Sequence, residues 1–360
     1  MSADPGRESS AHRSSILDVA ALAGVSPATV SRSLRGLSKV APQTRQRVQD
    51  AARELSYVIS PQASGLASGR TRAVAVVVPF ITRWFFSTVV AGVTDVLRES
   101  GYDVILHHLG GANDRDRFFA RMPLARRVDG VLSLSMPLTD EHTLALRALD
   151  IPLVSVGSPM PGVPSVGIDE VAAAQTAVNH LLHQGHEQIG FIAGIPDDPR
   201  FGFVSSQLRR RGYELALTAA GVSVNPELTV AGSYGLEGGA AAMAQLLSGP
   251  VLPTAVFAEY DELAIGALWA LRRAGLPVPQ KMSVVGIDDH EMAQVFELTS
   301  VAQNVHEQGA AAARLLLQAL ETPSAHQADT DIVLPTRLVL RGTTSPPSGR
   351  SRTARKRRGG

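Results

Sequence analysis

Few residues in this sequence have the types and spacing that catalysis or metal binding requires. Cysteine is absent, which excludes thiol nucleophiles, disulfides and Cys-ligated zinc. The segment HQGHE (183–187) holds two histidines three residues apart beside a glutamate, a pattern that a metal site could use. Gly185 is, however, a natural helix stop between a helical pattern and an apolar run, so a helix end is the favoured interpretation. The segment DDHE (288–291) has no second ligand cluster at a known spacing.

The motifs of several large enzyme classes are also missing. The sequence contains no GxSxG, P-loop or GxGxxG motif, and no nucleophile or paired acid and base is visible. We therefore expect no enzyme activity, no metal and no cofactor. An α/β enzyme acting on sugars or nucleotides is the first competing hypothesis, and turnover of a ligand by the purified protein would support it.

A different chemistry is indicated by the segment DVAALAGVSPATVSR (18–32), which combines small apolar residues with hydroxyls and an arginine. Gly24 permits a sharp turn that ends a short first helix. Ser26 then serves as the N-cap of a second helix, with Pro27 at its first position. Two short helices joined by a Gly-containing turn are the helix-turn-helix pattern. The residues expected to face inward are Val19, Ala20, Ala23, Val30 and Leu34.

The outer face of the second helix suits a nucleic acid. In a helix-turn-helix the start of this helix enters the major groove, where arginine can pair with O6 and N7 of guanine. Serine and threonine hydroxyls suit phosphate oxygens. A plain helical hairpin with a solvated Ser/Arg face is the alternative. The candidate DNA-binding residues are Ser26, Pro27, Ala28, Thr29, Ser31, Arg32 and Arg35.

The elements that position these groups follow from the hydrophobic periodicity. Residues 14–58 contain three short helical patterns, the third with Pro42 at its first position and a poor cap in Ala41. From Ala73 onward, short Val/Ile/Leu runs alternate with amphipathic stretches, which indicates parallel sheets covered on both faces. The apolar runs are 73–79, 102–109, 128–135, 152–157, 189–194, 228–234, 254–260 and 282–288; the helical patterns are 84–100, 138–149, 170–184, 205–220, 236–248, 261–275 and 307–320.

These units exceed one ordinary doubly wound sheet, so two Rossmann-like lobes or one closed barrel are the two architectures to choose between. We favour two lobes in residues 73–345, because segments near 164–172, 299–306 and 333–338 look like chain crossings between them. The Ser/Gly-rich segment 59–72 fits a linker.

Charge is distributed unevenly, although the net charge is only +1. Residues 1–72 carry 10 Lys/Arg against 5 Asp/Glu, whereas residues 73–345 carry 18 against 28. A basic N-terminal segment, here called the head (1–72), on an acidic body (73–345) indicates that the head has a polyanionic partner. We expect residues 1–13 and the basic tail 346–360 to be disordered, with the tail adding a weak attraction to DNA phosphates.

The first fifteen residues contain no apolar run resembling a signal peptide, and no stretch of 18 or more apolar residues occurs. With the absence of cysteine, this predicts a cytoplasmic protein. A periplasmic transport-type binding protein is the second competing hypothesis, but such a protein would need an export signal and would lack a DNA-reading head.

Several motifs in order along the chain resemble one known family. ILDVAALAGVSPATVSRSLRG (16–36), followed by VAPQTRQRVQDAARELSY (40–57), is similar to the DNA-binding head of the lactose/galactose repressor (LacI/GalR) family of bacterial transcription regulators. The resemblance continues to about residue 344. It includes the segments GRTRAVAVVVP, HLLHQGHEQIGFIAG, AVFAEYDELAIGALWALRRAG and MSVVGIDDHEMA.

This resemblance implies an α/β fold with an all-α helix-turn-helix head, a hinge helix and a two-lobed, periplasmic-binding-protein-like body with parallel Rossmann-like sheets. It places a hinge helix at residues 60–68 that folds on the operator, with Leu66 as an apolar wedge between base steps. Gly65 and three serines lower the helix propensity of this hinge away from DNA. Packing of Leu66 beneath the linker is the alternative.

The resemblance also places a small-molecule effector at the carboxyl ends of the strands, between the lobes. Two positions depart from the family, because Phe80 and Tyr260 stand where an Asp and an Asn are frequent. Aromatic residues there disfavour a simple free hexose and leave a glycoside, nucleoside or other ring-bearing ligand. Ordinary lobe packing is the alternative for the aromatic residues of PFITRWFF (79–86). The expected effector-binding residues are Phe80, Trp84, Phe85, Arg209, Tyr234, Tyr260, Asp261 and Asp288.

Together these features predict a sequence-specific transcriptional regulator, in the form of a repressor, that binds a pseudo-palindromic operator under effector control. The tail lacks the leucine heptads of a tetramerisation helix, so a homodimer is expected. The effector, the operator and the direction of its control are left open.

The wedge assignment predicts a selective loss of affinity in the variant Leu66→Ala. Because the wedge acts only where the duplex is kinked, binding to the specific operator should weaken far more than binding to random DNA. Titrations of both DNAs at one salt concentration measure the two affinities. Equal losses on both would contradict the assignment.

Overall fold

The computed structural model describes residues 14–34, 40–57, 70–136, 138–195, 203–322 and 330–348. Its internal contacts divide the chain into two compact units, Met1–Arg72 and Ala73–Gly360. The expected hinge helix, with Leu66, and Arg35 lie outside the described residues. The end segments for which disorder was predicted also lie outside them, apart from residues 346–348.

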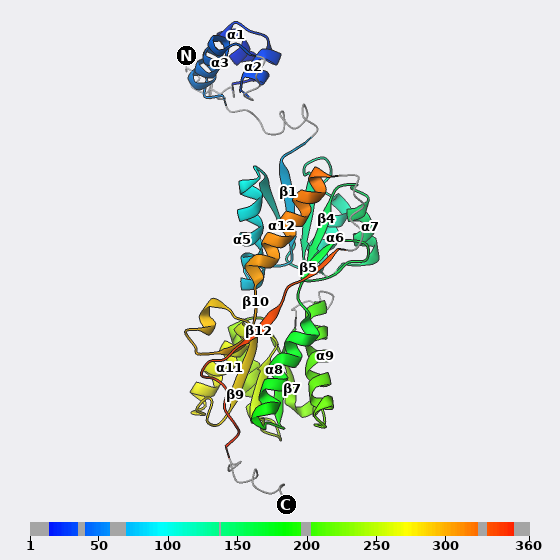
Figure 1. The fold of residues 1–360 in the computed structure, drawn as a ribbon, viewed down its shortest axis with the longest axis vertical. Helices are drawn as coiled ribbons and strands as arrows, with labels where there is room; N and C mark the ends of the chain where they lie inside the picture. The colour runs from blue at the N-terminus through cyan, green and yellow to red at the C-terminus, as the bar shows by residue number, and fades with distance from the viewer. Residues whose placement is uncertain are drawn as a thin grey trace, which may run out of the picture. The chain divides into compact units, whose positions relative to one another are not determined.

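The first unit contains the three expected short helices, α1 (Ile16–Ala23), α2 (Pro27–Leu34) and α3 (Pro42–Glu54) (Figure 1). Gly24 ends α1 with φ 64°, in the left-handed region that glycine adopts without strain. The Ser26 hydroxyl accepts a hydrogen bond from the Thr29 N–H at 3.2 Å, so Ser26 caps α2 as predicted. The sequence analysis missed the capping box of α1, in which Ser15 and Asp18 bond reciprocally.

The core of this unit confirms which face of each helix turns inward. Val19 and Val30 are fully buried, and Leu34 packs against them from the end of α2. Ala41 provides no side-chain hydrogen bond to α3, as its residue type predicts. The buried apolar residues are Val19, Ala20, Ala23, Val30, Val48, Ala51 and Ala52.

The second unit contains two separate six-stranded sheets, which excludes the closed barrel. Each sheet with the helices that cover it is here called a lobe. The sheet of lobe 1 is parallel throughout and has the order β11-β5-β4-β3-β1-β2. The sheet of lobe 2 has the order β12-β10-β9-β8-β6-β7, with only β12 antiparallel to its neighbour. The strands are β1 (Ala73–Val78), β2 (Asp103–His108), β3 (Gly130–Leu134), β4 (Leu153–Val156), β5 (Ser165–Gly167), β6 (Ile189–Ile195), β7 (Thr229–Ser233), β8 (Ala255–Ala258), β9 (Ser283–Asp288), β10 (Thr299–Gln303), β11 (Asp331–Val333) and β12 (Thr336–Val339).

Helices cover the sheets of both lobes. Those of lobe 1 are α5 (Trp84–Glu99), α6 (Ala112–Arg121), α7 (Asp140–Arg147) and α12 (Val305–Glu321), and those of lobe 2 are α8 (Glu170–Gln184), α9 (Val204–Ala219), α10 (Leu236–Leu247) and α11 (Asp261–Arg273). Two short 3-10 helices, η2 (Pro226–Leu228) and η3 (Glu291–Ala293), belong to lobe 2. The sequence analysis missed α6, because its charged ANDRDR start hides the apolar stripe that ends in Phe118 and Phe119.

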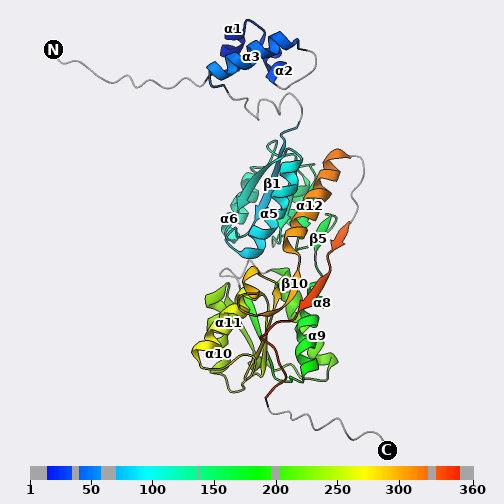
Figure 2. The ribbon, with the colours of Figure 1, turned by 60° about the vertical axis from the view of Figure 1, so that its left-hand side comes forward.

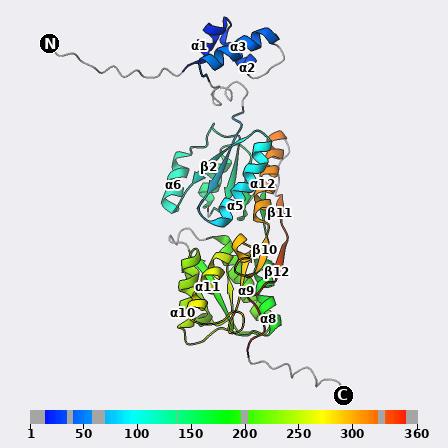
Figure 3. The ribbon, with the colours of Figure 1, turned by 90° about the vertical axis from the view of Figure 1, so that its left-hand side faces the viewer.

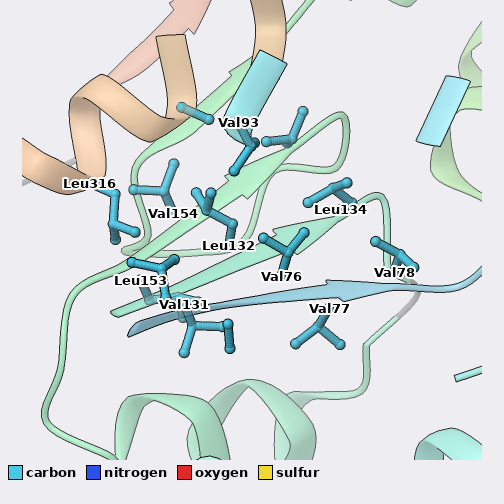
Figure 4. Close-up of a cluster of buried hydrophobic side chains, with 14 of the residues drawn as sticks. Val76, Val77, Val78, Val93, Val131, Leu132, Leu134, Leu153, Val154 and Leu316 are labelled. Carbon is cyan, nitrogen blue, oxygen red and sulfur yellow. The ribbon is translucent and has the colours of Figure 1, made fainter. Parts of the chain in front are cut away.

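Continuous apolar strands form the centre of each lobe because both of their faces are covered. All six residues of β1 are buried. Figure 4 shows Val93 of α5 and Leu316 of α12 gathered with Val76, Leu132 and Val154 of the lobe 1 strands. Each such side chain contributes about 1.5–3 kcal/mol through burial. None of the described helices is long and apolar enough to span a lipid bilayer.

The chain passes between the lobes three times, after β5, after β10 and between β11 and β12 (Figure 2). The third crossing is itself a pair of strands, with Leu334 and Pro335 between them (Figure 3). The sequence patterns did not predict these two short edge strands as strands. All three crossings lie at the same junction, so the facing ends of the two sheets are held close together.

The packing of α5 against α12 depends on glycine. A Cβ atom at Gly309 would lie 2.1 Å from the Val89 carbonyl oxygen, and one at Gly92 would lie 2.0 Å from the His306 carbonyl oxygen. Such distances force the helix backbones apart. We therefore expect Gly309→Ala to lower the free energy of unfolding by about 1–3 kcal/mol.

Urea unfolding followed by circular dichroism measures this change. Gly167→Ala is the matched control, because a Cβ atom there meets only ordinary contacts at 3.7 Å or more. Equal stabilities of the two variants would show that α5 and α12 do not need the close approach.

Candidate functional site

The first candidate site is the exposed start of α2. Ser26, Pro27 and Ala28 are exposed, and so is Arg32 one turn further along. Thr29 is half-buried, and its hydroxyl lies 2.9 Å from that of Ser26. Backbone N–H groups at a helix N-terminus attract anions, and an exposed arginine on the same helix adds a positive charge. The start of α2 therefore has the geometry and charge to approach a polyanion.

Of the remaining residues expected at this site, Ser31 is half-buried in α2. Val30, between Ser31 and Thr29, is directed into the core, which fixes the rotation of the helix. Arg35 and Leu66 lie outside the described residues, so their placement stays a prediction.

The second candidate site is a cleft between lobe 1 and lobe 2, at the carboxyl ends of strands from both sheets. Its volume is about 80 Å³. Of the residues expected here, Phe85, Arg209, Tyr234, Tyr260 and Asp288 line it. The remaining lining residues were not predicted from the sequence; they are Arg83, Phe86, Ser135, Glu170, Phe203, Ser205, Ser206, Glu259 and Glu262.

Arg209 of α9 is the centre of the polar wall of this cleft. It is buried, and its Nε donates to a Glu170 carboxylate oxygen at 2.6 Å. Its Nη1 donates to the Glu259 carbonyl oxygen at 2.7 Å and lies 3.9 Å from an Asp288 carboxylate oxygen. Burial opposes the charged guanidinium, but Glu170 and Asp288 outweigh that cost and raise the pKa of Arg209. The arginine is therefore a fixed cation.

Asp288 is the last residue of β9, at the strand end where it was predicted, and has a φ of 132°. Its carboxylate accepts a hydrogen bond from Gln303 Nε2 at 2.6 Å. Burial raises the pKa of Asp288 well above its usual range, although Arg209 works in the opposite direction. A carboxyl group held in this way can accept hydrogen bonds from ligand hydroxyls.

Glu259, which the sequence analysis missed, is almost fully buried at the end of β8. Its carboxylate accepts hydrogen bonds from the Gly194 N–H at 2.9 Å and from the Ser206 hydroxyl. Burial raises the pKa of this group as well. The sequence could have indicated that Glu259 belongs to the cleft, because it lies at a strand end, one residue before Tyr260.

Tyr234 and Tyr260 form the aromatic side of the cleft. Their rings are stacked with centroids 5.8 Å apart. Gly194 makes room for Tyr260, since a Cβ atom there would lie 2.6 Å from its hydroxyl oxygen. Both hydroxyl oxygens are buried and have no hydrogen-bond partner among the described residues. An unpaired buried hydroxyl costs about 1–3 kcal/mol, so a polar ligand group beside them would be favoured.

Three expected residues do not line the cleft. Phe80 packs beside it against Phe203, with ring centroids 6.3 Å apart. Trp84 packs across the lobes against His290, at 4.7 Å. Asp261 is fully buried behind β9, where its carboxylate accepts from the Ser300 hydroxyl and the His290 N–H at 2.8–2.9 Å. In the structure, Asp261 therefore joins elements of lobe 2 through hydrogen bonds.

The HQGHE segment is the predicted helix end. Helix α8 ends at Gln184, and Gly185 caps it with φ 99°. His186 is buried and lies 2.9 Å from the Thr254 hydroxyl and 2.8 Å from the Ser345 carbonyl oxygen. Its ring nitrogens thus join the C-terminal segment to lobe 2.

Two family models match the chain. The model of bacterial regulatory proteins of the lacI family matches residues 15–60, and that of the periplasmic binding protein-like domain matches residues 178–344. The HTH-type transcriptional repressor CytR of Escherichia coli (strain K12) is 35% identical over 331 residues, covering 91% of this chain and 95% of that protein. Catabolite control protein A of Priestia megaterium is 34% identical over 334 residues, covering 91% and 98%.

Solved structures agree with these relatives. The lac repressor dimer bound to operator and the anti-inducer ONPF matches with a TM-score of 0.80 and 28% identity, covering 92% of this chain and 99% of that one. The complex of the transcriptional regulator CelR with cellobiose matches with a TM-score of 0.67 and 34% identity, covering 92% and 100%. The relatives are transcriptional regulators rather than enzymes. The protein belongs to the LacI family of bacterial regulatory proteins.

Proposed function

We propose that this protein is a transcriptional repressor that binds a pseudo-palindromic operator as a homodimer and is controlled by a small-molecule effector. The exposed, capped start of α2 is the observation that carries the DNA-binding role. Arg32 is the residue on it that can read guanine, and the hydroxyls near the helix start are suited to phosphates. The protein acts in the cytoplasm, where the nucleoid supplies its operator.

The homodimer is supported by an exposed apolar surface on lobe 2. Trp269 is 52% exposed and Phe296 is 41% exposed, and both line one groove with Leu276 and Val278. Large exposed apolar residues that gather in one place mark association surfaces. The lac repressor, whose structure matches this chain, is a dimer on its operator. Two heads in such a dimer read two halves of one site.

The effector role is supported by the cleft. Arg209 and Asp288 offer a donor and an acceptor that are already held in place, so a ligand with neighbouring hydroxyls meets little ordering cost there. The rings of Tyr234 and Tyr260 provide a face for stacking. CelR, which is similar to this chain, binds cellobiose. We propose a sugar derivative, glycoside or nucleoside as the class of effector, with Phe80, Trp84 and Asp261 as supporting residues that shape the site.

The DNA-binding role predicts that Arg32→Ala lowers affinity for the operator by about ten- to a hundredfold, which corresponds to about 1–3 kcal/mol. Footprinting on the DNA upstream of the protein's own gene identifies the operator, and titration measures the affinities. Arg47→Ala on α3 is the matched control, because it removes the same charge from another exposed position of the head. If both variants lost equal affinity for operator and random DNA, Arg32 would contribute charge alone.

The effector role predicts that Asp288→Asn weakens effector binding by at least tenfold, since a hydrogen bond to a charged group contributes about 1.5–3 kcal/mol. Some stability should be lost as well, because Asp288 helps to compensate the buried charge of Arg209, so thermal unfolding is measured to confirm that the variant is folded. The ligand is whichever sugar, glycoside or nucleoside alters the footprint, and calorimetry measures its affinity. Asp289→Asn is the control, since Asp289 pairs with Arg341. Unchanged affinity in Asp288→Asn would remove Asp288 from the site.

A further inference from the structure

Arg83 occupies an aromatic cage at the edge of the cleft. Its guanidinium carbon lies 3.5 Å from the ring centroid of Tyr234, 3.9 Å from that of Phe80 and 5.8 Å from that of Phe203. Phe203 also contacts both other rings, with centroid distances of 6.3 Å to Phe80 and 5.9 Å to Tyr234. Phe80, Phe203 and Tyr234 are called the aromatic cage below. Rings arranged around a cation bind it through their negatively charged faces.

Arg83 is held there by the rings rather than by an ion pair. It precedes the first turn of α5 and forms no side-chain capping bond to that helix. Within the described residues, no carboxylate lies within ion-pair distance of its guanidinium. Burial lowers the pKa of Arg83, and Tyr234 and Glu262 act in the opposite direction. The side chain can therefore leave the cage without breaking an ion pair or the helix.

Arg83 limits the free space in the cleft, which is about 80 Å³. Arg83 itself lines the cleft and fills the space between the rings of the two lobes. Withdrawal of this one flexible side chain enlarges the cleft and leaves the buried Arg209 contacts intact.

The charges that line the cleft select what can replace Arg83. Four carboxylates line it, those of Glu170, Glu259, Glu262 and Asp288, against the two arginines Arg83 and Arg209. Arg209 is already engaged with Glu170 and Asp288. The positive charge of Arg83 favours the ionised form of Glu262 and so lowers its pKa, although burial raises it more strongly. Departure of Arg83 leaves an excess of acidic groups beside an empty aromatic cage.

We propose that the cleft binds an organic cation, such as an ammonium, amidinium or guanidinium group, in the aromatic cage that Arg83 now occupies. This inference rests on the effector role of the cleft and specifies the chemistry of one part of the ligand. The rest of the ligand reaches the donor and acceptor of Arg209 and Asp288. Arg83 acts as an internal competitor, which the ligand must displace.

The variant Arg83→Ala tests this proposal, with N-ethylguanidinium as the probe that replaces the missing side chain and neutral N-ethylurea as its isostere. Calorimetry and thermal unfolding are measured on the full chain. We expect the variant to bind N-ethylguanidinium at least tenfold more tightly than N-ethylurea, with a saturable rise in Tm. The wild-type protein should bind N-ethylguanidinium more weakly than the variant does, because Arg83 competes with it.

Arg273→Ala is the matched control, because the Arg273 guanidinium also stacks on a ring, at 5.0 Å from the Trp269 centroid, but on the surface of lobe 2. It should bind N-ethylguanidinium no more tightly than the wild-type protein does. Equal binding of the two probes by Arg83→Ala, or binding of neither, would overturn the proposal. If Arg83→Ala does not fold, Arg83→Gln takes its place with the same expectation of cation selectivity, and equal binding of the two probes again overturns it.

The outcome is separable from that of the proposed function. If a neutral sugar or nucleoside alters the operator footprint while neither Arg83 variant selects the cation, the regulatory role holds and the cation site is wrong. If the protein protects no palindromic DNA under any condition, the regulatory role fails whatever the cleft binds.

Discussion

The buried charge of Arg209 is the constraint on which the architecture of the cleft depends. A guanidinium can be buried only where its donors are paired, and here the partners come from separate parts of lobe 2. Glu170 begins α8, Glu259 follows β8 and Asp288 ends β9. Satisfying one arginine therefore fixes the positions of a helix start and two strand ends. The polar groups of the cleft are in place before any ligand arrives.

The aromatic groups contribute a different property, because they join the two lobes without fixing them. Trp84 of lobe 1 contacts His290 of lobe 2, and Arg83 of lobe 1 lies over the ring of Tyr234. Stacking contacts tolerate sliding better than the short hydrogen bonds of Arg209 do. The rigid half of the site thus belongs to lobe 2, and the adjustable half lies between the lobes.

Much of this arrangement could be predicted from the sequence, and the failures have physical reasons. Gly24, Ser26 and Pro27 encode a local turn, so the head required no knowledge of distant contacts. Asp288 was predictable from its place at a strand end. Asp261 does not line the cleft, because position along the chain does not tell which way a carboxylate at a helix start faces. Arg83 and Glu259 were missed because their roles depend on residues far away in the sequence.

Control of DNA binding by this cleft requires a ligand that prefers one arrangement of the lobes over another. Groups bound only to lobe 2, such as hydroxyls on Arg209 and Asp288, supply affinity but little preference between arrangements. Preference must come from contacts that change when the lobes move, and the contacts of Trp84 and Arg83 with lobe 2 are of that kind. A ligand that alters the Arg83 contact thus acts where the free energy of the lobe arrangement is most easily shifted. Phe80 and Tyr260, which the resemblance suggests are departures from the family, lie beside this same contact. We therefore expect them to bear on how an effector signals as well as on which effector binds.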